Sequence, residues 1–208
     1  MKKVLILVAA LLVGIQAHAQ LQADGGYQHF FEHGRITDPV DNSSSAIHYG
    51  WDGFYLGGRY NLELPWVNGL SVLPGVNFSF MFNRVATNAS GREVALNIPV
   101  DVAYTLDFGA IQLRGFVGPN FQIGLTNSLV ASGGNATTRY NMYADNGNPY
   151  ALNTRGRVNV SLGLGAGIVV REHFTGHIRY DLGVVNLSTA QYTRLFRNTL
   201  QVGVGYIF

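Results

Sequence analysis

The feature that most constrains this chain is a strict period of two in its side chains. Between residues 195 and 208, apolar residues alternate with polar or small residues over almost the whole length. The same alternation runs through residues 111–123, 157–170 and 177–184. Because successive side chains of a β-strand point to opposite faces, this period predicts strands. We therefore expect an all-β protein.

The contents of the two faces separate a membrane barrel from a soluble sandwich. The polar face carries arginines, carboxylates, amides and glycines in mid-strand, while the apolar face is nearly free of charge. Lysine is absent after Lys3, although the exposed face of a soluble sandwich would be rich in lysine and glutamate. An apolar face toward lipid and a polar face toward a lumen are typical of a transmembrane barrel, whose closure also satisfies every backbone hydrogen bond in lipid.

The connections between the expected strands alternate in length. Eight strands are expected, at residues 20–32, 51–64, 70–83, 92–106, 110–124, 156–171, 174–186 and 195–208. Short connections are expected at residues 65–69, 107–109 and 172–173, and longer ones at residues 33–50, 84–91, 125–155 and 187–194. Short periplasmic turns and long surface loops are the barrel topology. The prediction is an eight-stranded antiparallel up-and-down transmembrane β-barrel with both termini periplasmic.

Three prolines fall inside these strands. Pro74, Pro99 and Pro119 each lack the N–H that a closed barrel needs for its ladder. We expect Pro74 and Pro119 to mark either a bulge or a strand boundary that lies elsewhere.

The first residues carry the features of a secretory signal peptide. Two lysines precede an apolar run over residues 4–15, which is shorter than the roughly 20 residues that a membrane-spanning helix needs. Small residues at Ala17 and Ala19 then predict cleavage after Ala19. We expect a signal peptide at residues 1–19 and one outer-membrane barrel domain at residues 20–208.

Composition narrows the classes of function. The 208 residues include no cysteine, which excludes a disulfide scaffold and a cysteine metal site. After the signal peptide, 12 arginines face 12 carboxylates, so this part of the chain is neutral. A neutral, aromatic-rich chain lacks the clustered cations that neutralise phosphates along a nucleic acid. We expect no nucleic-acid partner, no metal and no cofactor.

Several stretches carry a resemblance. Residues 96–104 contain Ile-Pro followed by alternation that ends at a tyrosine, residues 163–167 are glycine-rich, and residues 179–186 form a late charged strand. In this order they resemble the porin-like outer-membrane β-barrel domain family, the PorT-like group of small Gram-negative barrels. The terminal Tyr206 and Phe208 resemble the C-terminal signal that the outer-membrane barrel insertion machinery recognises. The resemblance implies a barrel in a Gram-negative outer membrane and fixes no ligand.

Charged side chains are expected on the lumen face. With a tight turn at residues 107–108, Asp101 and Arg114 become direct cross-strand neighbours. Such charges form either a selectivity ring or a salt-bridged plug, and the plug is favoured because eight strands leave a lumen just wide enough for its own side chains. The expected lumenal network consists of Arg59, Glu63, Asp101, Arg114, His177, Arg179, Asp181 and Arg197.

Arginines also gather at the expected outer ends of the strands. At these strand ends the arginines outnumber the acidic residues by two. Arginine is a favoured bidentate donor to phosphate, so either pairing with lipopolysaccharide phosphates or simple solvation at the rim accounts for them. The expected outer-rim arginines are Arg84, Arg92, Arg155, Arg157 and Arg194.

The remaining polar residues do not favour catalysis. His29 and His33 are four residues apart, but they fall at a strand end, where this spacing does not assemble a zinc site. His177 is an acid–base candidate, yet no His-x-Ser segment or Gly-x-Ser-x-Gly elbow accompanies it.

The sequence therefore predicts a non-catalytic integral outer-membrane scaffold that presents surface loops for envelope integrity or surface interaction. One alternative is a narrow pore or small-solute transporter, and another is a lipid-modifying enzyme. The expected partners are outer-membrane lipid, lipopolysaccharide and the barrel insertion machinery, and the oligomeric state stays open. Residues 125–155 are rich in Asn, Gly, Ser, Thr and Tyr, which is typical of a recognition loop.

Overall fold

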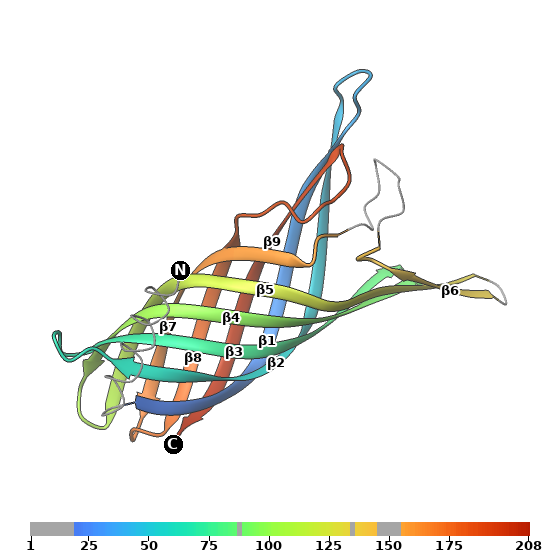
Figure 1. Cartoon of the computed structure of the whole chain (residues 1–208). Helices are drawn as coiled ribbons and strands as arrows, with labels where there is room; N and C mark the ends of the chain where they lie inside the picture. Colours follow the sequence, from blue (N-terminus) through green and yellow to red (C-terminus); the bar gives the residue numbers. More distant parts are fainter. Residues whose placement is uncertain (1–18, 87–88, 134–135, 145–154) are drawn as a thin grey trace, which may run out of the picture.

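The computed structural model describes residues 19–86, 89–133, 136–144 and 155–208 (Figure 1). The predicted signal peptide lies outside the described residues, apart from Ala19. The described residues form the strands β1 (Ala19–Thr37), β2 (Ser44–Glu63), β3 (Leu70–Ala86), β4 (Ala89–Asp107), β5 (Ile111–Gly133), β6 (Ala136–Asn141), β7 (Val158–Val170), β8 (Phe174–Gly183) and β9 (Thr193–Ile207). None of the described residues belongs to a helix that is long and apolar enough to cross a membrane.

Eight of these strands form a closed antiparallel ring. Their order is β4-β3-β2-β1-β9-β8-β7-β5, and pairing of β4 with β5 closes it. This confirms the predicted eight-stranded antiparallel barrel. Among the described strands, the additional strand β6 pairs with β5 alone, and it projects to one side of the barrel as a flap (Figure 1). The flap lies inside the segment 125–155, which the sequence predicts to be a loop.

Side chains alternate between the lumen and the outer surface as the period of two predicts. On β9, Arg197, Thr199 and Gln201 are buried in the lumen, whereas Val202 and Val204 are 45% and 71% exposed on the outside. In a soluble protein such exposure of aliphatic side chains over a whole surface would be unfavourable. In a bilayer these side chains meet lipid, and the closed ring leaves no unpaired strand edge.

The two ends of the barrel differ. The chain end at Phe208 and the first residues of β1 lie at one end, which also holds the short turns β2–β3, β4–β5 and β7–β8. We call this the turn end. At the opposite end, the hairpin end, β1 and β2 stay paired up to Thr37 and Ser44 (Figure 1). There β9 runs beside β1 as far as Ile36, whereas the pairing of β2 with β3 ends at Asp52. The prediction of a loop over residues 33–50 is therefore wrong, because most of that segment continues the two strands.

The prolines lie within the strands without shifting the register. Pro74 is opposite Val100, and Pro119 is opposite Leu162. On the other side of each proline the ladder skips two positions and resumes in the same register. The register shifts in these sheets lie elsewhere, near Arg84 and Val94. The expected bulges at Pro74 and Pro119 are therefore absent, since each missing donor coincides with a local gap in pairing.

The pairing of Asp101 with Arg114 is also wrong. The turn between β4 and β5 is longer than the predicted one, because the backbone N–H of Phe108 donates to the carbonyl of Ile111 and Gly109 has a φ of 83°. Arg114 consequently lies opposite Thr105. Asp101 instead approaches Gly118, where an added Cβ would meet the Asp101 Cα at 2.7 Å.

Candidate functional site

A first group of charged side chains fills the lumen near the hairpin end. Arg197 lies between Glu32 and Glu93: its Nη2 is 2.6 Å from Glu32 Oε1, and its Nη1 is 2.5 Å from Glu93 Oε1. Arg155 also donates to Glu32. All four side chains are at most 5% exposed. We call these four residues the hairpin-end cluster.

Neutral side chains complete the bonding of this cluster. Trp51 Nε1 donates to Glu32 Oε2 over 3.0 Å, and Asn127 Nδ2 donates to Glu93 Oε2 over 2.7 Å. The Arg197 guanidinium also lies 4.3 Å from the ring centroid of Phe30. Both carboxylates are therefore compensated by charge and by hydrogen bonds, which burial of an ion pair requires.

A layer of hydrogen-bonded amides spans the middle of the lumen. Ser79 Oγ donates to Gln28 Oε1 over 2.5 Å and accepts from Asn97 Nδ2 over 2.6 Å. Gln122 Nε2 donates to Asn97 Oδ1, and its Oε1 accepts from Arg197. Side chains from β1, β3, β4 and β5 are thereby joined to the hairpin-end cluster.

A second group of charges lies toward the turn end. Arg179 donates to both oxygens of Asp101, at 2.6 and 2.5 Å, and to Asp181 Oδ1 at 2.7 Å. Arg59 is more distant from its carboxylates, at 3.5 Å from Asp24 and 3.9 Å from Asp101. The turn-end cluster consists of Asp24, Arg59, Asp101, His177, Arg179 and Asp181.

His177 is enclosed within this cluster. Its Nε2 lies 2.7 Å from the hydroxyl of Tyr55, 3.3 Å from Arg59 Nη2 and 3.5 Å from Asp24 Oδ2. The side chain is buried, and the cavity beside it has a volume of about 20 Å³. One water molecule needs roughly 10–15 Å³ by this measure, so this cavity has room for about one water molecule.

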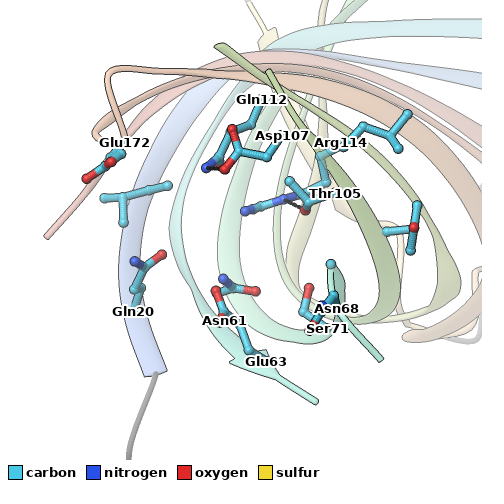
Figure 2. Close-up of a pocket in the computed structure, with 14 residues that line it drawn as sticks. Gln20, Asn61, Glu63, Asn68, Ser71, Thr105, Asp107, Gln112, Arg114 and Glu172 are labelled. Carbon is cyan, nitrogen blue, oxygen red and sulfur yellow. Dashed lines mark hydrogen bonds between the residues drawn. The ribbon is translucent and has the colours of Figure 1, made fainter. Parts of the chain in front are cut away.

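A polar vestibule of about 490 Å³ opens at the turn end (Figure 2). Arg114 and Glu63, both expected in the lumenal network, line this vestibule and belong to neither cluster. Arg114 Nε donates to Thr105 Oγ1 over 3.2 Å. Amides and hydroxyls supply most of the remaining polar lining, as Figure 2 shows for Asn61 and Ser71. The cavity beside Arg59 and His177 measures about 20 Å³, and the one beside the hairpin-end cluster measures about 10 Å³.

The predicted outer-rim arginines divide into two groups. Arg84, Arg92 and Arg194 are exposed on the outer side of the hairpin end. Arg157 is also exposed, donates to the carbonyls of Gly124 and Leu125, and lies over the Tyr143 ring.

Arg155 does not lie on the outer rim. Its side chain is buried in the hairpin-end cluster, where it pairs with Glu32. The prediction for Arg155 is therefore wrong.

Sequence reasoning missed Glu32, Glu93 and Asp24 as lumenal partners. Glu32 and Glu93 lie near strand ends, so their position along the chain suggests the outer rim, whereas the alternation of the strand turns their side chains into the lumen. A signal was present: Gln22, Asp24, Gln28 and Glu32 are all even-numbered in one strand and therefore share a face.

Tyr206 and Phe208 form part of an aromatic group at the turn end. The ring centroid of Tyr206 lies 5.5 Å from that of Phe174 and 5.2 Å from that of Phe208. Phe208 is 70% exposed on the outer surface. Aromatic side chains at strand ends are typical of the girdles at the two interfaces of a membrane barrel.

Together, a closed ring, an apolar outer surface and a charged lumen define a membrane-spanning β-barrel. The chain belongs to the family described as outer membrane protein beta-barrel domain, which matches it over residues 5–208. This family indicates the outer membrane of a Gram-negative bacterium. No group of three or more metal-binding side chains occurs among the residues that the structure describes.

Several solved barrels are similar in structure. Ail, the attachment invasion locus protein of Yersinia pestis, is 14% identical, with coverage of 89% of this chain and 99% of that chain and a TM-score of 0.38. OprG from Pseudomonas aeruginosa is 10% identical, with coverage of 91% and 96% and a TM-score of 0.46. Neisserial surface protein A is 13% identical, with coverage of 91% and 97% and a TM-score of 0.40. A comparison with curated protein sequences gives no match.

Proposed function

We propose that this protein is a non-conducting outer-membrane scaffold that presents its long hairpins at the cell surface. The observation that carries the proposal is the filled lumen, in which two charge clusters and an amide layer lie one above the other. In this orientation the turn end and both chain termini face the periplasm, as the short turns favour.

The energetics of the lumen support a sealed barrel. An ion passing through would have to separate Arg197 from Glu32 and Glu93, and then Arg179 from Asp101. Removing one partner from a buried ion pair costs about 3–5 kcal/mol, because the other charge stays buried without compensation. Two such clusters in series oppose conduction more strongly than either cluster alone.

Conductance of the refolded mature protein in a planar bilayer tests this proposal. Folding is first verified by the shift of the folded barrel in an unheated gel. We expect no channel steps from the unmodified protein, from Glu32→Ala/Arg197→Ala, or from Asp101→Ala/Arg179→Ala, because one cluster still seals each double variant. The combined fourfold variant should conduct. Arg84→Ala/Arg92→Ala, on the outer surface, is the matched control and should stay silent.

Steady openings from the unmodified folded protein would contradict the sealed scaffold and support the narrow pore. Sensitivity of those openings to Arg179→Ala would place the pore through the turn-end cluster. A fourfold variant that folds and stays silent would show that the clusters are not the seal.

The orientation has its own test. A protease site inserted after Asn42, in the turn between β1 and β2, should be cleaved in intact cells. A site appended after Phe208 should be cleaved only after the outer membrane is permeabilised. The opposite pattern would overturn the proposed orientation and leave the conductance result unaffected.

The surroundings of His177 support a scaffold without catalysis. A ring held by Tyr55 and Arg59 beside a cavity of about 20 Å³ has no room for a lipid chain. We expect His177→Gln to leave the mass spectrum of lipid A from expressing cells unchanged. A changed lipid A mass with the unmodified protein, abolished by His177→Gln, would instead support the lipid-modifying enzyme.

A further inference from the structure

At the hairpin end, the charged residues that point into the lumen differ from those on the outer surface of the barrel. Glu32 and Glu93 point into the lumen, where Arg155 and Arg197 neutralise them. These two carboxylates and two arginines cancel, so the small positive balance of this region remains outside the lumen. Four arginines are exposed on that outer side: Arg35, Arg84, Arg92 and Arg194.

Two of these arginines face each other across the first and last strands. Arg35 of β1 is the direct register partner of Arg194 of β9. Two residues closer to the barrel, His33 pairs with Phe196 on one side and with His48 of β2 on the other. His33, Arg35, His48 and Arg194 are all exposed, and we call them the basic patch.

Among the described residues, no carboxylate forms an ion pair with the basic patch. Like charges directly opposite in a sheet are destabilising, yet in the described ranges of the chain neither Arg35 nor Arg194 forms an ion pair or a side-chain hydrogen bond. The nearby Asp52 is engaged by Tyr27 and by His29, the latter over 2.7 Å.

The acidic residues of the β1–β2 turn are engaged locally. Asp38 accepts the backbone N–H of Val40, and Asp41 accepts that of Ser43. Hydrogen bonds from the Ser43 side chain and backbone lower the pKa of Asp41, so this carboxylate stays ionised and bound within its own turn. The opposed arginines thus have no carboxylate partner among the described residues and are accessible to an external anion.

The depth of the patch indicates where that anion is found. Phe31, 43% exposed, and Phe196 are the last aromatic side chains on the outer faces of β1 and β9 before the basic patch. Leu200, Val202 and Val204 continue the apolar surface toward the turn end. Two residues of a strand span roughly 6–7 Å, which sets Arg194 about that far beyond Phe196, where hydrocarbon gives way to headgroups.

We propose that the basic patch binds the phosphate groups of lipopolysaccharide in the outer leaflet, with Arg35 and Arg194 closing on one phosphate from two strands. Guanidinium groups bind phosphate oxygens bidentately, and a dianion between two arginines removes their mutual repulsion. The inference rests on the orientation given under the proposed function, since only that orientation exposes the patch to the outer leaflet.

Titration calorimetry of the folded protein in a zwitterionic detergent tests this site. The ligands are lipid A with both phosphates, enzymatically dephosphorylated lipid A, and inorganic phosphate. The variant is Arg35→Gln/Arg194→Gln. The matched control is Arg139→Gln/Arg171→Gln, which removes two exposed charges from the flap and the turn end. We expect the variant to bind phosphorylated lipid A at least about tenfold more weakly and the control to bind it normally.

Each other result overturns the proposal in a definite way. Equal affinity of variant and unmodified protein would remove Arg35 and Arg194 from any binding site. Equal binding of the dephosphorylated lipid would assign recognition to acyl chains or sugars. Inorganic phosphate that binds as tightly as phosphorylated lipid A would make the site one for a soluble anion.

Thermal unfolding without lipid separates a binding role from a structural one. Because the two arginines repel each other, the double variant should unfold at the same temperature as the unmodified protein or higher. Phosphorylated lipid A should raise the unfolding temperature of the unmodified protein and have little effect on the variant. A variant that unfolds at a lower temperature without lipid would contradict the unpaired state of the patch. None of these measurements depends on conductance. A negative result for lipopolysaccharide binding can therefore be distinguished from a negative result for the sealed scaffold.

Discussion

The hairpin-end and turn-end clusters fill the same lumen but are bonded differently. In the hairpin-end cluster, Arg197 reaches both Glu32 and Glu93 over 2.9 Å or less. In the turn-end cluster, Arg179 is held as closely, whereas Arg59 stands 3.5 and 3.9 Å from its carboxylates. The weaker half of the turn-end cluster is the half beside Arg114, which lines the open vestibule.

This difference relates tight bonding to distance from water. Arg197 is surrounded by protein on every side, so each of its donors needs a protein acceptor. Arg59 is 4% exposed, hardly more than Arg197, but it lies next to a cavity of about 20 Å³, which has room for about one water molecule. The looser ion pairs of Arg59 therefore lie beside Arg114, which also lines the vestibule.

The largest expected effect comes from removing Arg197, the tightly held cation of the hairpin-end cluster, and Arg59 of the turn-end cluster serves as the comparison. Arg197→Met should lower the free energy of unfolding by about 3–5 kcal/mol, because two carboxylates lose their main partner inside the barrel. Arg59→Met should cost clearly less. Urea titration of protein folded in lipid vesicles measures both values. An equal loss for the two variants would show that distance and solvent access do not separate the clusters.

Two glycines test the packing around Arg179 and Asp181, the closely bonded part of the turn-end cluster. A Cβ on Gly163 would lie 1.9 Å from Asp181 Oδ1 and 2.4 Å from Arg179 Nη2, whereas one on Gly115 meets nothing within 4 Å. We expect Gly163→Ala to cost about 1–3 kcal/mol through overpacking. Gly115→Ala, the matched control, should stay within about 0.5 kcal/mol in the same urea titration. A neutral Gly163→Ala would mean that Arg179 has an alternative position.

The smallest effect is expected from an element outside the ring. Because β6 pairs only with β5, replacing residues 130–140 by Asn-Gly should change the free energy of unfolding by less than about 0.5 kcal/mol. The gel shift of the folded barrel should persist. A loss comparable to that of Gly163→Ala would indicate that the flap stabilises the hairpin-end cluster through the following segment.

The fold was predictable where lipid and lumen impose opposite demands on neighbouring residues. Arg179 and Asp181 are two residues apart in an alternating strand, so their shared lumenal face follows from the period alone. Beyond the membrane this contrast fades, since both faces of a projecting hairpin meet water. The run Ser43–Ser45 consequently shows no alternation, and the continuation of β1 and β2 was missed.

Contacts across the lumen were less predictable than the faces. The pairing of Asp101 depends on the length of the turn before Ile111, and a turn of different length moves every cross-strand neighbour. The position of Arg155 depends on how the chain re-enters the ring after the flap, for which no periodic signal exists. Both wrong predictions, for Asp101 and for Arg155, depend on how distant parts of the chain meet in the closed barrel. The local alternation of residues carries no information about that.

The seam between β1 and β9 has a mechanical consequence. Every other pair of neighbours in the ring consists of strands that are consecutive in chain order among the eight ring strands. This pair joins the first strand to the last. Near the turn end, Gln22 pairs with Ile207, so the start of the first strand and the end of the last lie side by side. A force that separates the two ends of the chain acts perpendicular to these two strands at this point. It therefore breaks their hydrogen bonds one after another, whereas a force along the strands would load all of them together. The barrel wall is therefore weakest toward a force on its own termini.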